Sequence, residues 1–198
     1  TVRGAALYTG GTLSITADSV QIGPGQPGQP ASPGTLVIDP AIFRDAGFSR
    51  YKVSAVQSGL TVADNTLIDL TPQNLVLDTG YQARPTGADL SQFSHLETLP
   101  LFEREPVNLS LTSVRGGKVI DRNAGLIIGS GATIHADPGA SVALSSDRML
   151  TVFGTIDAPA SNIDLTLQNG LDSDGFFPDK AIWLGSGAAL NAPGAVVL

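Results

Sequence analysis

The sequence contains no cysteine and few aromatic or charged residues. The absence of cysteine from all 198 residues excludes disulfide scaffolds, zinc–thiolate sites and cysteine nucleophiles. One tryptophan, three tyrosines and seven phenylalanines leave few of the aromatic platforms that carbohydrate grooves commonly use. Charged residues make up 15% of the chain and hydrophobic residues 42%, which is the balance of a folded protein rather than a disordered one.

Basic residues and long apolar runs are also scarce. Eleven Lys and Arg residues stand against eighteen Asp and Glu, a formal net charge of −7, so we expect no nucleic-acid partner and no attraction to anionic lipid. No uninterrupted apolar run reaches about 18 residues, so we expect no membrane span. The chain starts at Thr1 without a signal-peptide pattern, and we expect residues 1–198 to be a single segment of a longer protein.

Glycine, proline and aspartate, by contrast, are abundant. With 23 glycines and 13 prolines, the chain holds too many helix breakers for a helical bundle. Apolar residues alternate with Ser, Thr, Asn or Asp in many short segments, which predicts β-strands with one apolar face. The fold class we expect is therefore all-β, with short strands at 13–16, 36–38, 52–56, 60–62, 67–70, 75–77, 107–112, 119–120, 127–128, 142–144, 150–152, 163–167 and 182–184.

The strands repeat along the chain. Residues 129–144 (GSGATIHADPGASVAL) realign with residues 185–198 (GSGAALNAPGAVVL), which begin 56 residues later. A short strand cannot bury its apolar face alone, but stacked repeats can pair in parallel and enclose their Leu, Ile and Val side chains. This pattern predicts a solenoid rather than a sandwich, which would show hairpin signals between strands.

Two segments interrupt the repeats. Residues 21–33 are rich in Pro, Gly and Gln and predict a surface loop. Residues 81–106 contain all three glutamates and three prolines, and we expect them to form an insertion outside the solenoid. Within the insertion, Asp89 precedes Leu90, Phe93, Leu96 and Leu99 at helical spacing, which predicts a short amphipathic helix.

Three segments resemble a known family. Residues 150–167 (LTVFGTIDAPASNIDLTL), 181–192 (AIWLGSGAALNA) and 47–55 (GFSRYKVSA) resemble repeats of large bacterial exoproteins of the filamentous haemagglutinin type. The resemblance covers residues 34–79 and 107–198. It implies a right-handed parallel β-helix within a long protein that is exported by two-partner secretion, through an outer-membrane barrel, to the cell surface or medium. It also implies a role in adhesion, biofilm formation or contact-dependent interaction with a surface receptor or glycan.

The alternative function is catalysis, because parallel β-helices also host polysaccharide lyases and glycoside hydrolases. Such enzymes need carboxylates close together on one face. We expect no enzyme activity, because most of the aspartates lie in turns, and we expect Trp183 to belong to the core. The candidates for catalysis are Asp64, Asp69, Asp121, Asp147, Asp157 and Asp164.

No cofactor or metal site is predicted. Residues 23–28 read G-x-G-x-x-G, but two internal prolines and the Pro-rich continuation exclude the helix that a dinucleotide site requires. His95 and His135 are isolated from further ligands, and Asp172 with Asp174 indicates a solvated corner. His135 aligns with Asn191 of the repeat, so we expect it to face solvent.

Loops are the expected interaction surfaces, because recognition concentrates in loops on a regular scaffold. An alternative is that the phenylalanines fold back and cover the solenoid. The candidate interaction residues are Phe102, Glu103, Arg104, Glu105, Phe176 and Phe177.

Overall fold

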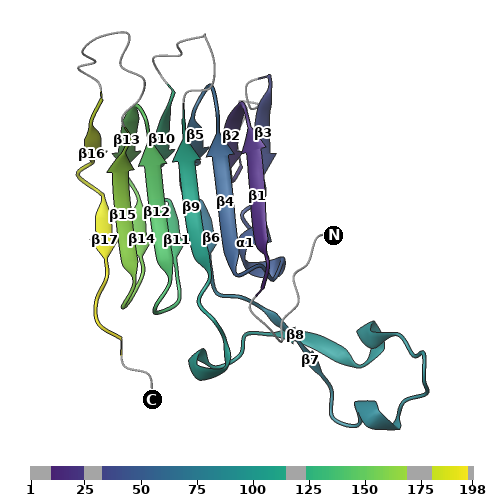
Figure 1. Ribbon diagram of the computed structural model, residues 1–198. Coiled ribbons are helices and arrows are strands. Elements are labelled where there is room, and N and C mark those ends of the chain that lie inside the picture. Colours follow the sequence, from purple (N-terminus) through teal and green to yellow (C-terminus); the bar gives the residue numbers. More distant parts are fainter. Residues whose placement is uncertain (1–9, 25–32, 115–123, 169–179, 196–198) are drawn as a thin grey trace.

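The computed structural model describes residues 10–24, 33–114, 124–168 and 180–195. The described chain is all-β and is dominated by three parallel sheets, as the alternating pattern predicts. Figure 1 shows their strands standing side by side, with a separate arm projecting from one end of them. The expected strand at 119–120 and the candidates Asp121, Phe176 and Phe177 lie outside the described residues.

Sheet A contains the longest strands. Adjacent strands pair in parallel and in register, so that residues of like character form rows across the sheet. Its order is β1 (Thr12–Ala17), β4 (Arg50–Ala55), β9 (Asn108–Ser113), β12 (Ser141–Ser146) and β15 (Asn162–Leu167).

Sheets B and C are built in the same way from shorter strands. Sheet B has the order β16 (Ile182–Leu184), β13 (Met149–Val152), β10 (Gly125–Ile128), β5 (Leu60–Val62), β2 (Ser19–Ile22) and β3 (Thr35–Ile38). Sheet C has the order β17 (Ala189–Asn191), β14 (Thr155–Asp157), β11 (Thr133–His135) and β6 (Leu67–Asp69).

Four consecutive layers supply these sheets. Each layer gives one strand to sheet A, then one to sheet B, then one to sheet C; the layers are β4–β6, β9–β11, β12–β14 and β15–β17. The two repeats found 56 residues apart fall on equivalent positions, because β10–β11 and β16–β17 occupy the same two sheets. Equivalent residues of successive layers therefore lie side by side and point to the same face of their sheet.

Aliphatic side chains fill the space between the sheets. In sheet A the inward row runs through Val53, Leu111 and Leu144, all buried, and corresponding rows in sheets B and C pass through Ile128 and Ile134. Stacking of like side chains in register removes apolar surface from water in every layer, which is the principal source of stability for such short strands.

The two ends of the stack differ. At the β3 end, helix α1 (Ile42–Asp45) packs near β6 and buries Phe43 against Tyr51, with ring centroids 5.1 Å apart. The Tyr51 hydroxyl donates to the Ile42 carbonyl (2.9 Å), and burial raises the pKa of Tyr51 to about 12. At the β16 end, Ile182 and Leu184 continue inward rows but remain exposed.

The structure corrects four expectations. Strand β2 runs to Ile22, so the predicted loop at 21–33 begins two residues too early. The inserted segment begins before residue 81, because β7 (Asn74–Leu77) belongs to it. The predicted amphipathic helix is wrong: a short 3-10 turn, η2 (Leu90–Gln92), is followed by strand β8 (Ser94–Glu97). Trp183 is not in the core; it is 60% exposed and lies in register with Thr151, on the side of the sheet opposite the buried Leu150 and Val152.

Candidate functional site

The most distinctive surface is the segment 74–106, here called the arm. Its strands β7 and β8 form an antiparallel ribbon that projects from the parallel sheets (Figure 1). Two further 3-10 turns, η1 (Tyr81–Ala83) and η3 (Leu101–Glu103), flank the ribbon. The Asp89 carboxylate accepts a hydrogen bond from the Ser91 amide (3.0 Å), which caps η2 and lowers the pKa of Asp89.

A bidentate ion pair fixes the arm to the layers. Arg104 donates from Nε to Asp137 Oδ2 (2.6 Å) and from Nη2 to Asp137 Oδ1 (2.7 Å), and it also donates from Nη1 to the Leu99 carbonyl. The two side chains are only 12% and 6% exposed. The hydrogen bonds and charge of Asp137 raise the pKa of Arg104. Arg104, expected to meet a partner, instead positions the arm.

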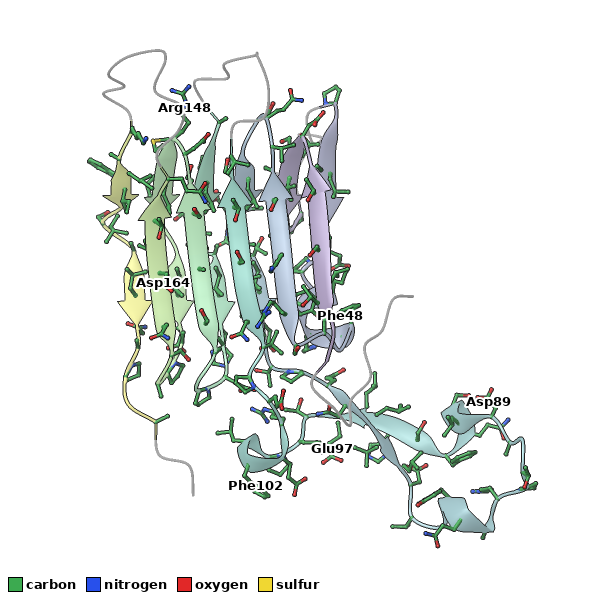
Figure 2. The ribbon with its side chains drawn as sticks, in the orientation of Figure 1. Phe48, Asp89, Glu97, Phe102, Arg148 and Asp164 are labelled. Atoms are coloured by element: carbon green, nitrogen blue, oxygen red, sulfur yellow. The ribbon has the colours of Figure 1, made fainter. Side chains whose placement is uncertain are left out.

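The neighbouring candidate residues remain on the surface. Phe102 is 70% exposed, which is the largest exposure among the large hydrophobic side chains that the structure describes as exposed, and Glu103 beside it is exposed too. Glu105 is also exposed. Figure 2 shows Phe102 at the outer side of its turn, so this phenylalanine does not fold back over the sheets.

The ribbon has two chemically different faces. His95 Nδ1 donates to Asp78 Oδ1 (2.7 Å) and Nε2 donates to Glu97 Oε2 (3.3 Å), and both hydrogen bonds raise the pKa of His95. The opposite face presents Leu75 and Leu96, which lie directly across from each other. Sequence reasoning missed both groupings, because His95 lies in a segment expected to be helical, whereas Asp78, 17 residues earlier, lies outside the segment expected to be inserted.

The structure brings two of the catalytic candidates into one row, here called the acidic row. Asp69, His135 and Asp157 occupy equivalent positions on β6, β11 and β14, on the outward side of sheet C, and Asn191 continues the row. His135 Nδ1 donates to Asp157 Oδ2 (3.3 Å). The prediction that His135 faces solvent at a position equivalent to Asn191 is confirmed.

The acidic row places an imidazole between two carboxylates, which are residue types that general acid–base catalysis uses. Strands stand about 4.8 Å apart, so the backbones of Asp69 and Asp157 are roughly 10 Å apart, with His135 on the strand between them. Asp69 ends β6, five residues before the arm begins at Asn74, so the acidic row starts near the base of the arm in the sequence.

The remaining described aspartate candidates are elsewhere. Asp64 accepts a hydrogen bond from the Ser130 amide (2.8 Å) and stabilises the corner between β10 and β11. Asp164 points outward from sheet A, as Figure 2 shows, and Asp147 is half-buried just after β12. These three do not join the acidic row.

Within the described ranges, no group of three or more His, Asp or Glu side chains is arranged to hold a metal ion. None of the helices in the part of the chain that the structure describes is long and apolar enough to cross a membrane. Comparison with known protein families, with curated proteins and with solved structures finds no match.

Proposed function

We propose that this chain is a structural and adhesive segment of a large secreted bacterial surface protein, folded as a right-handed parallel β-helix. Three parallel sheets that receive one strand each from four successive layers support the helical part of this proposal. Connections between parallel strands are right-handed in about 98% of cases, which supports the handedness. The resemblance of residues 150–167 to filamentous haemagglutinin repeats supports the family.

The arm is the observation that carries an adhesive role. The layers present regular walls, whereas the arm adds irregular surface that includes the exposed Phe102 and is held at a defined position by the pair of Arg104 with Asp137. A rigidly anchored projection is already in its binding conformation, so it loses little conformational entropy when it binds a partner. On this proposal the chain passes through an outer-membrane secretion barrel and meets a receptor or glycan at the surface of another cell.

Bead adhesion tests the proposed function. Beads coated with the purified chain are expected to attach to host-cell monolayers or bacterial lawns above the level of albumin-coated beads. Phe102→Ser is expected to reduce attachment, whereas Val37→Ser, which alters an exposed strand residue outside the arm, is expected to leave it unchanged. Attachment no greater than that of albumin beads would refute the adhesive role.

A second candidate function is polysaccharide cleavage, and the acidic row favours it. On this candidate function His135, hydrogen-bonded to Asp157, serves as the general base, and Asp69 lies on the neighbouring strand on the other side of His135. The test is release of new reducing ends or unsaturated sugars from a panel of acidic and neutral polysaccharides. Turnover that Asp157→Asn abolishes and Asp164→Asn preserves would establish the enzyme and displace the adhesive role.

A further inference from the structure

The β7–β8 ribbon is amphipathic across its two faces. In an antiparallel pair, residues directly opposite each other point to the same side. The pairs Leu75 with Leu96 and Leu77 with Ser94 therefore share one face, and the pairs Val76 with His95 and Asn74 with Glu97 share the other. One face is aliphatic, and the other carries the imidazole with its carboxylate partners.

The aliphatic face is uncovered. Leu75, Leu77 and Leu96 are 46%, 39% and 42% exposed, although they lie on strands, where such residues normally pack. Among the described strands, β7 and β8 pair with each other and with no third strand. A two-stranded ribbon is marginally stable, and a third strand would add both backbone hydrogen bonds and apolar cover.

The arm is acidic, and this charge favours basic residues in any strand that would be added to the ribbon. The arm holds five acidic residues, Asp78, Asp89, Glu97, Glu103 and Glu105, but only two arginines. Asp137, outside the arm, is paired with one of these arginines, Arg104. Asp78 and Glu97 bracket the polar face through their contacts with His95. That face favours a cationic neighbour.

We propose that an extended segment of a partner protein, with aliphatic residues alternating with Lys or Arg, adds as a third strand to the β7–β8 ribbon. Alternate side chains of a strand point to opposite faces, so the aliphatic residues extend the leucine face while the basic residues reach Asp78 and Glu97. This inference deepens the adhesive role proposed above and rests on it for the biological setting, not for the binding chemistry.

Charge argues against other occupants. A second copy of this chain would bring a net charge of −7 against an already acidic arm. Nucleic acid and anionic lipid would meet the same repulsion. A basic polypeptide strand satisfies both faces of the ribbon at once.

Peptide binding to the intact chain tests the proposal. The probe is a short fluorescent peptide of alternating leucine and lysine, followed by anisotropy, with a leucine–glutamate peptide and a serine–lysine peptide as comparisons. We expect saturable binding of the leucine–lysine peptide only, and added amide-exchange protection in β7 and β8. Leu75→Asn combined with Leu96→Asn is expected to weaken binding about tenfold or more. Glu97→Gln is expected to weaken peptide binding severalfold. The binding that remains is expected to depend less on salt concentration than binding to the wild type does.

Matched controls separate the outcomes. Val37→Asn changes an exposed strand residue away from the arm and is expected to leave binding unchanged. The proposal is overturned if no peptide binds, if the serine–lysine peptide binds equally well, or if the double leucine variant, shown by circular dichroism to be folded, binds as wild type does. Bead adhesion that persists in any of these cases would leave the adhesive role standing, whereas peptide binding without adhesion would remove only that role.

Discussion

Breaking the ion pair between Arg104 and Asp137 is expected to release the arm. The pair makes two hydrogen bonds of 2.6 and 2.7 Å at a site where both side chains are nearly enclosed. Removing one partner of a buried pair leaves the other charge desolvated and unpaired, so Arg104→Ala is expected to cost about 2–4 kcal/mol. Arg104 also donates to the Leu99 carbonyl, which loses its partner in the same variant.

A double-mutant cycle measures this coupling directly. Urea denaturation of Arg104→Ala, Asp137→Ala and the double variant should give a coupling energy of about 1.5–3 kcal/mol, because the two side chains contact each other. The adjacent, exposed pair of Arg44 and Asp45 is the control, and Arg44→Ala is expected to cost less than about 0.5 kcal/mol. A coupling energy near zero, with amide exchange in the arm unaltered, would refute the assignment of Arg104 as the anchor.

Three further predictions concern the corners, the core and the ribbon. Gly154→Ala places a Cβ against the Ala132 carbonyl oxygen and should destabilise the chain by more than about 2 kcal/mol, whereas Gly187→Ala meets only ordinary contacts and should be nearly neutral by thermal denaturation. Leu126→Ala, in the buried row of β10, should cost about 2–4 kcal/mol, and Ile127→Thr, on the outward side, less than about 1 kcal/mol, measured in urea; equal costs would contradict the assigned faces. Because the folded pKa of His95 is raised, its hydrogen bonds stabilise the ribbon fully below the unfolded pKa, and this contribution is lost as the pH rises through the folded value. The protection factors of the β7 and β8 amides, which are corrected for the intrinsic rise of exchange with pH, should therefore fall over that pH range in the wild type and not in His95→Gln.

The acidic row shows where sequence reasoning reached its limit. Asp69 and Asp157 were recognisable as candidates, but nothing in their spacing showed that they would flank His135. Their alignment depends on the in-register pairing of β6, β11 and β14, which in turn depends on how long each corner is. A single extra residue in one corner would have turned a side chain to the opposite face.

The arm was the less predictable part of the chain. The pattern of Leu90, Phe93 and Leu96 is compatible with helical spacing, yet β8 pairs with β7, a strand that lies before the segment expected to be inserted. A short helix has a costly nucleus, and pairing with a nearby strand stabilises these residues better than one isolated turn. The partner of Arg104 lies 33 residues away on a corner of the layers, and no local signal marks it.

By itself, the sequence determined that the chain forms short strands with one apolar face and that they repeat, because alternation and turn residues are local properties that survive in any tertiary arrangement. It also located the two interruptions of the repeats, although the structure places their starts elsewhere, after Ile22 and at Asn74. Only the tertiary structure decided which aspartates share a face, that Arg104 holds the arm to Asp137, that Trp183 points outward and that the leucines of the ribbon stay uncovered. These outcomes depend on register and on contacts between distant segments, and both are fixed only when all the layers pack together.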